Sequence, residues 1–144
     1  MESHISEITR VIQLSVAPAF LLVAIGTLIT ILSTRLNRIV DRRRLLQDRL
    51  REQGGEPSAE VKRELGLLAQ RSNLIYYAIL SAVTGALLVC LVVAGSFLGA
   101  LLTTELAEMV ATLFVLAMIA MFIAWSLFLR EVFIAVRTRT HKYW

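Results

Sequence analysis

The chain has 144 residues, of which 57% are hydrophobic and 18% are charged, and its formal net charge is +4 at pH 7. A water-soluble domain needs more polar residues to cover its surface, so this composition excludes a soluble enzyme, a secreted disulfide scaffold and a disordered tail. The composition indicates an integral membrane protein.

Three stretches of the sequence contain no charged residue at all: residues 11–34, 72–104 and 109–129. Each is longer than the roughly 18 apolar residues that mark a membrane-spanning helix. Because lipid offers no partner for backbone hydrogen bonds, helices are the spanning form expected here. We therefore predict an all-α integral membrane protein with three transmembrane helices over these residues.

The segments between and beyond these stretches are short, and the longest of them is basic. Residues 35–71 combine apolar positions at helical spacing with a turn composition at residues 54–57, Gly-Gly-Glu-Pro. This pattern predicts an antiparallel helical hairpin, called the basic stalk below, whose helices continue the spans that they adjoin. Residues 105–108 leave room only for a tight turn, and residues 1–10 and 130–144 form short terminal segments.

The distribution of positive charge predicts the orientation of the chain in the membrane. Of its 15 Lys and Arg residues, 14 lie in segments 35–71 and 130–144, and only Arg10 lies elsewhere. Cytoplasmic segments beside a span are the ones that carry Lys and Arg. The stalk and the C-terminus are therefore expected in the cytoplasm, with the N-terminus and residues 105–108 outside. High basicity then reflects topology, and no nucleic-acid partner is expected.

A polar stripe crosses the first predicted span. Its five members recur at spacings of 3, 4, 3 and 4, which places them on one face of a helix; they are Thr27, Thr30, Thr34, Asn37 and Asp41. One interpretation is hydrogen bonding between helices. The other is a pore lined by Thr27, Thr30, Thr34 and Asn37, formed when several copies of this span surround an axis.

Other residues in the spans suit helix packing. Pro18 removes one backbone hydrogen bond, so it predicts a kink in the first span, either structural or with freed carbonyls that line an opening. In the second span, Gly85 follows Ser81 and Gly99 follows Gly95 at a spacing of four. Small residues at this spacing let helix backbones approach closely, within one subunit or between subunits.

Two charged clusters lie beside the spans. A run of arginines follows the first span and is a topology determinant or a site for anionic lipid headgroups or a partner; it comprises Arg35, Arg38, Arg42, Arg43 and Arg44. Acidic residues on the expected outer side would concentrate cations at the mouth of a ring of subunits; they are Glu2, Glu7, Glu105 and Glu108. The basic inner side of the ring would instead favour anions at the inner mouth.

Enzymatic chemistry finds no support in the sequence. No ionisable Asp, Glu, His, Lys or Arg falls within a predicted span, and His4 and His141 lie at opposite ends of the chain. Catalysis needs a nucleophile and base, or metal ligands, within reach of one another. We therefore expect no catalytic residue, no metal and no cofactor. Proton-coupled transport is disfavoured because no carboxylate or histidine lies within a predicted span.

Two short stretches carry a family resemblance: Ala17-Pro-Ala-Phe-Leu-Leu22 and Arg35-Leu-Asn-Arg-Ile-Val-Asp-Arg42. They resemble the small bacterial membrane family called domain of unknown function 2721, most sharply over residues 17–44. The resemblance implies the plasma membrane of a bacterium or archaeon. It implies no established activity, so no site residue follows from it.

Two functions remain after these exclusions. The stripe favours a homo-oligomeric membrane pore that conducts inorganic cations. A single basic stalk also has too little apolar area to be rigid alone, which favours packing against other copies. The alternative to this packing is that one stalk lies against the lipid headgroups, with its charged side chains reaching water. The alternative is a non-conducting membrane scaffold or accessory protein, whose basic cytoplasmic stalk binds a partner or anionic lipid.

Overall fold

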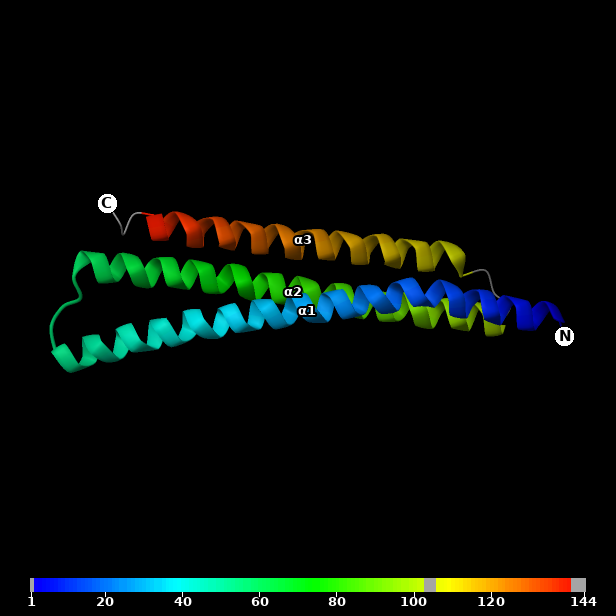
Figure 1. Ribbon diagram of the computed structural model, residues 1–144, viewed down its shortest axis with the longest axis horizontal. Coiled ribbons are helices and arrows are strands. Elements are labelled where there is room, and N and C mark those ends of the chain that lie inside the picture. Colours follow the sequence, from blue (N-terminus) through cyan, green and yellow to red (C-terminus); the bar gives the residue numbers. More distant parts are fainter. Residues whose placement is uncertain (1, 103–105, 141–144) are drawn as a thin grey trace. The chain divides into compact units, whose positions relative to one another are not determined.

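The computed structural model describes residues 2–102 and 106–140, with the backbone alone at residues 2, 139 and 140. These residues form three helices, α1 (Glu2–Gln53), α2 (Ala59–Leu102) and α3 (Ala107–Thr140), and no strand lies among them (Figure 1). All three helices are long and apolar enough to cross a membrane. The predicted all-α fold with three membrane-spanning helices is confirmed at this level.

The break between α1 and α2 lies where the glycine and proline residues predict it. Gly54 follows the last residue of α1 and has a φ of 60°, a left-handed conformation that glycine adopts without steric cost. Ser58 then caps α2, because its hydroxyl oxygen accepts a hydrogen bond from the backbone N–H of Val61 at 3.4 Å. On the side of this break, α1 continues past residue 34 and α2 begins before residue 72, the bounds expected for their spans. The helix α1 also continues through Pro18, whose kink stays a prediction.

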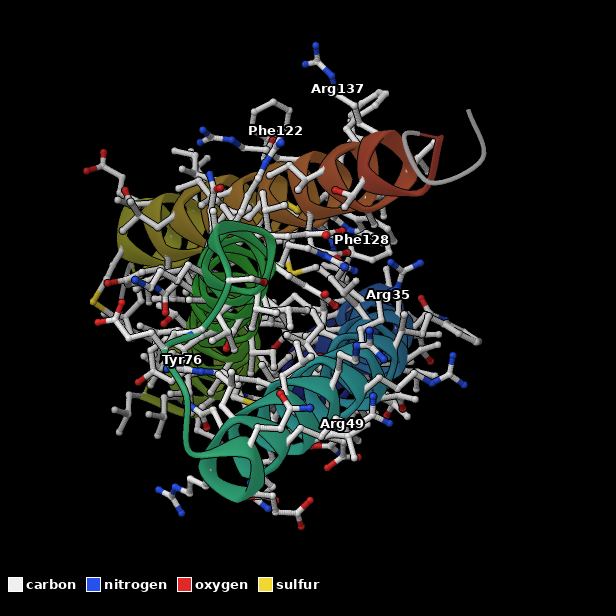
Figure 2. All side chains as sticks on the ribbon, turned by 90° about the vertical axis from the view of Figure 1, so that its left-hand side faces the viewer. Arg35, Arg49, Tyr76, Phe122, Phe128 and Arg137 are labelled. Carbon is white, nitrogen blue, oxygen red and sulfur yellow. The ribbon has the colours of Figure 1, made fainter. Side chains whose placement is uncertain are left out.

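The buried residues of α1 follow a regular spacing along the helix. Positions three and four residues apart lie on one helix face, and the buried apolar side chains occur at such positions. They are Ile25, Leu28, Leu32, Ile39 and Leu46. The large side chains of Tyr76 and Phe122 are instead exposed, by 58% and 73%. Figure 2 labels both residues. Lipid is the environment that suits such exposed apolar surface.

The chain divides into two compact units, of which the first comprises Met1–Ile29 and Ser81–Ile123. Within it, α2 and α3 approach closely at two glycines. A Cβ atom on Gly85 would lie 3.2 Å from Sδ of Met121, and one on Gly95 would lie 3.1 Å from Cγ2 of Val110. The hydroxyl of Ser81 donates a hydrogen bond of 2.6 Å to the carbonyl oxygen of Ala120. Gly85 and Gly95 therefore serve packing inside one subunit.

The second unit comprises Thr30–Leu80 and Ala124–Trp144. Its buried apolar side chains include Ile39 and Leu46 of α1 and Leu68 of α2. Ion pairs join its helices: Arg42 of α1 donates two hydrogen bonds to Oε1 of Glu64 on α2, at 3.1 and 3.0 Å. This unit thus combines a narrow apolar core with many charged side chains.

Candidate functional site

All five residues of the polar stripe are exposed, and the geometry of α1 explains why. Each stands two residues after a buried or half-buried position, which is about 200° around a helix of 3.6 residues per turn. The pairs are Ile25 and Thr27, Leu28 and Thr30, Leu32 and Thr34, Arg35 and Asn37, and Ile39 and Asp41. The stripe therefore faces away from the side of α1 that packs against the rest of the chain.

The threonine hydroxyls of the stripe bond to their own helix. Thr27 donates to the carbonyl oxygen of Val23 at 3.0 Å, and Thr34 donates to that of Thr30 at 2.9 Å. These two hydroxyls therefore do not donate to another helix of the subunit. Such hydrogen bonding between helices is one of the two interpretations of the stripe. Because each hydroxyl proton is used within the helix, the lone pairs of the oxygen are what Thr27 and Thr34 present outward.

The acidic residues of the expected outer side are only partly described. Glu7 on α1 and Glu108 at the start of α3 are both exposed. Glu105 and the side chain of Glu2 lie outside the described residues. Gly99, the third glycine assigned to packing, is half-buried on α2.

The structure separates the arginine run into two groups. Arg38, Arg43 and Arg44 are exposed, as a solvent-facing or lipid-facing cluster requires. Arg35 and Arg42 instead form ion pairs with acidic residues of other helices. These two side chains therefore link α1 to the other two helices.

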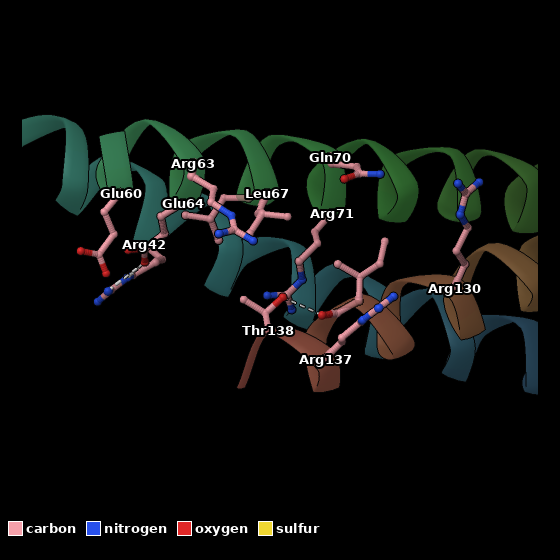
Figure 3. A pocket seen from close by; sticks show the side chains of 12 residues that line it. Arg42, Glu60, Arg63, Glu64, Leu67, Gln70, Arg71, Arg130, Arg137 and Thr138 are labelled. Atoms are coloured by element: carbon pink, nitrogen blue, oxygen red, sulfur yellow. Dashed lines mark hydrogen bonds and ion pairs between the residues drawn. The ribbon is translucent and has the colours of Figure 1, made fainter. Parts of the chain in front are cut away.

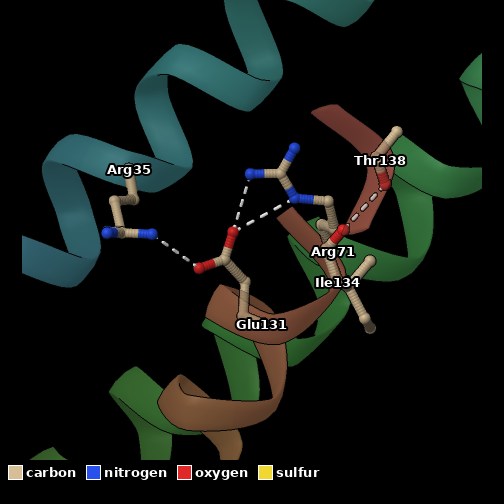
Figure 4. Close-up of polar contacts among 5 residues, drawn as sticks. All are labelled: Arg35, Arg71, Glu131, Ile134 and Thr138. Carbon is tan, nitrogen blue, oxygen red and sulfur yellow. Dashed lines mark hydrogen bonds and ion pairs between the residues drawn. The ribbon is translucent and has the colours of Figure 1, made fainter. Parts of the chain in front are cut away.

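Two arginines, Arg35 of α1 and Arg71 of α2, meet at Glu131 of α3. Its side chain is completely buried, and its Oε2 accepts a hydrogen bond from Nη1 of Arg35 at 2.9 Å. Its Oε1 accepts two hydrogen bonds from Arg71, from Nη2 at 2.8 Å and from Nε at 3.1 Å (Figure 4). The guanidinium of Arg35 also lies 5.1 Å from the ring centroid of Phe128, a cation–π geometry. We call Arg35, Arg71 and Glu131 the charge triad.

Each member of the triad lies at the edge of one of the three charge-free stretches. Arg35 directly follows the first charge-free stretch, Arg71 directly precedes the second, and Glu131 stands two residues after the third. A buried carboxylate is costly unless it is paired and hydrogen-bonded, and two guanidinium groups meet that need here. Neither Glu131 nor Arg71 is among the candidate site residues that the sequence predicts. The signal that could have found the pair is that Glu131 is the one acidic residue between positions 109 and 144.

A cavity of about 1020 Å³ lies in the same unit (Figure 3). Five arginines line it, from all three helices: Arg42, Arg63, Arg71, Arg130 and Arg137. Glu60 and Glu64 are the acidic lining residues, and Leu67, Leu68 and Ile134 are among the apolar ones. We call this space the arginine-lined cavity. A smaller cavity of about 530 Å³ shares Arg42 and Arg71 with it and is also lined by Arg35 and Arg38.

One known protein family matches most of the chain. The family model described as "Protein of unknown function (DUF2721)" matches residues 15–140. The chain belongs to the DUF2721 family. No match was found among curated proteins or solved structures. This match confirms the family resemblance that residues 17–44 carry.

The DUF2721 match contains the stripe, the charge triad and every residue of the arginine-lined cavity. Glu2 and Glu7, the N-terminal acidic residues of the expected outer side, lie before it. The DUF2721 description names no activity, so the function of this chain has to be argued from its own geometry.

Proposed function

We propose that the chain is a multi-pass protein of the plasma membrane of a bacterium or archaeon, with its N-terminus outside and its C-terminus in the cytoplasm. Fourteen of its 15 Lys and Arg residues support this orientation. The basic stalk then projects into the cytoplasm as an antiparallel helical hairpin. The bounds of α1 and α2 and the ion pair between Arg42 and Glu64 support this arrangement.

In this membrane the chain forms a homo-oligomer whose polar stripe lines a cation-conducting pore. The observation that carries this proposal is the exposure of the stripe on the side of α1 opposite its buried residues. A face that the subunit does not cover is available to surround an axis shared with other copies. Thr27, Thr30 and Thr34 then lie at successive depths, with Asn37 at the cytoplasmic end.

The hydrogen bonds of the stripe favour cations over anions. A dehydrated cation needs oxygen lone pairs, whereas an anion needs N–H or O–H donors. Thr27 and Thr34 spend their protons on backbone carbonyls and keep lone pairs for a ligand. On the outer side, the exposed carboxylates of Glu7 and Glu108 would raise the local cation concentration, within a screening length of about 8 Å at physiological salt.

Ion flux into liposomes that contain the purified protein tests this proposal. Thr34→Val removes a hydroxyl while nearly keeping the shape of the side chain, so we expect flux to fall at least tenfold with no change of oligomer size. The matched control is Thr112→Val, because Thr112 is also exposed and also donates to its own helix, at 2.8 Å from the carbonyl oxygen of Glu108. Normal flux in Thr34→Val, or equal loss in Thr112→Val, would contradict the pore.

The second candidate is a non-conducting scaffold or accessory protein whose stalk binds a partner or anionic lipid. The hydrogen bonds of Thr27 and Thr34 to their own helix also make these side chains tolerable in lipid, which favours this candidate. The exposed cluster of Arg38, Arg43 and Arg44 would supply the binding surface. Absence of cation flux under any gradient or voltage, whatever the oligomeric state of the intact protein, would support this function over the pore.

A further inference from the structure

We propose that the arginine-lined cavity binds a ligand that carries a phosphate group. The cavity brings guanidinium groups from three helices around one space, which no single stretch of sequence does. Five arginines line it against two glutamates, so the lining carries an excess of positive charge. This site is separate from the stripe, and the inference holds whether or not the protein conducts ions.

The lining arginines are not equivalent, because some of them already serve the fold. Arg42 binds Glu64, which neutralises one of the two lining glutamates, and Arg71 binds Glu131 through Nε and Nη2. Arg63 on α2 and Arg130 on α3 make no ion pair or hydrogen bond with any described residue. Their N–H groups remain available, and the planar guanidinium matches the oxygens of a phosphate group in geometry.

The cavity also offers room and apolar surface. Its volume of about 1020 Å³ exceeds what a phosphate ion fills, and Leu67, Leu68 and Ile134 provide carbon surface beside the guanidinium groups. A phosphate ester with an attached organic group suits this combination. Pockets for organic ligands have volumes of roughly 300–1000 Å³ and are lined by apolar residues with a few well-placed polar groups.

Two sources of such a ligand share this chemistry: an acidic phospholipid of the inner leaflet and a soluble phosphate ester. Arg71 and Arg130 flank the second and third charge-free stretches, so in the proposed orientation the cavity begins at the depth of the lipid headgroups. This placement favours the phospholipid, and it is the one step that rests on the proposed topology.

Lipid binding to the full chain in detergent, followed by native mass spectrometry, tests the inference. The probes are phosphatidylglycerol, phosphatidylcholine and glycerol 3-phosphate. We expect phosphatidylglycerol to bind at least tenfold more tightly than phosphatidylcholine. The double variant Arg63→Gln/Arg130→Gln should weaken phosphatidylglycerol binding by roughly tenfold or more, since each cation near an acidic headgroup contributes about 1 kcal/mol.

The control is Arg49→Gln/Arg51→Gln, which removes the same charge from exposed positions of α1 outside the cavity lining. It should bind phosphatidylglycerol like the unmodified protein. A third variant, Arg63→Lys/Arg130→Lys, keeps the charge and loses the planar donor pair, so intermediate binding is expected. The melting temperature of each variant checks that the exposed substitutions leave the fold intact.

The possible outcomes distinguish a phospholipid from a soluble phosphate ester, and they distinguish binding in the cavity from no specific site. Tight binding of glycerol 3-phosphate that Arg63→Gln/Arg130→Gln weakens would support the cavity and assign it to a soluble ester. Equal weakening by the control variant would show diffuse attraction and overturn the inference, as would equal binding of phosphatidylcholine or no effect of the cavity variant. Because the readout is binding and not flux, a failure here is distinct from a failure of the pore.

Discussion

The guanidinium of Arg71 donates two hydrogen bonds to one carboxylate oxygen of Glu131, from Nη2 at 2.8 Å and from Nε at 3.1 Å. The other oxygen of Glu131 accepts from Arg35, so one buried acid is shared by two cations on two further helices. The triad fastens α1, α2 and α3 to one another where their charge-free stretches end. Glu131 therefore contacts both other helices of the second unit.

Removal of the charge on Glu131 should therefore destabilise the protein. Glu131→Gln leaves Arg35 and Arg71 without their carboxylate. Loss of one partner from a fully buried ion pair typically costs about 3 kcal/mol or more. The side chains of Arg35 and Arg71 are 39% and 22% exposed, so we expect a loss somewhat below that figure. The measurement is unfolding of the detergent-solubilised protein by heat or denaturant. We also expect faster limited proteolysis within the basic stalk, because two of its anchoring contacts are lost.

The control for this variant is Glu64→Gln. Glu64 also pairs with an arginine of another helix, but the side chains of Arg42 and Glu64 are 45% and 35% exposed. Solvent screens such a pair, which contributes roughly 0–1 kcal/mol. Equal stability losses in Glu131→Gln and Glu64→Gln would contradict the special role of the triad.

A bulky residue at Gly95 should disrupt the packing of α2 against α3. Even a Cβ atom there would lie 3.1 Å from Val110, so Gly95→Leu forces the two helices apart and should lower the melting temperature. Gly66→Leu on the same helix is the matched control, since no atom lies within 4 Å of its added Cβ. It should be neutral or slightly stabilising, because glycine is a poor helix former. Equal melting temperatures would show that Gly95 is not at a tight contact.

The stripe should be wet if it lines a pore. In a Cys90→Ala background, Thr34→Cys should react with a water-soluble thiol reagent in membranes, because the reactive thiolate forms only where water reaches. Leu32→Cys, at a buried position, and Ile31→Cys, at an exposed apolar one, should react slowly. Thiol labelling detected by mass spectrometry measures the rates. A Thr34→Cys rate no faster than that of Ile31→Cys would place the stripe in lipid.

The proposed orientation can be tested with two cysteines in the same background. A cysteine at Gly55, in the break between α1 and α2, should resist an impermeant thiol reagent in intact cells and react after lysis. A cysteine at Ala107, the first residue of α3, should react in intact cells. Both positions are exposed, so access depends on the side of the membrane alone. Labelling in the opposite sense would reverse the topology.

The sequence alone determined the elements of this protein. Three stretches without charge require helices, because lipid cannot satisfy backbone hydrogen bonds. The Gly-Gly-Glu-Pro sequence at residues 54–57 marks the break between the first two helices. The 3-4 spacing of Thr27, Thr30 and Thr34 also defines one helix face without any knowledge of the neighbours. These features depend on residues close together in the chain, which is why local patterns are sufficient to predict them.

The pairing of the charged residues and the covered face of α1 follow from the packing of the helices and not from the sequence pattern. Arg35 and Glu131 are 96 residues apart. Arg35 continues the 3-4 spacing of Leu28 and Leu32, but that spacing does not show which acidic residue Arg35 contacts. The cavity likewise gathers Arg63 and Arg130 from two helices. Such contacts depend on how each helix is rotated about its axis. That rotation is set by apolar and ionic contacts between segments that are distant in the sequence. The same rotation buries Leu32 and leaves Thr34 exposed.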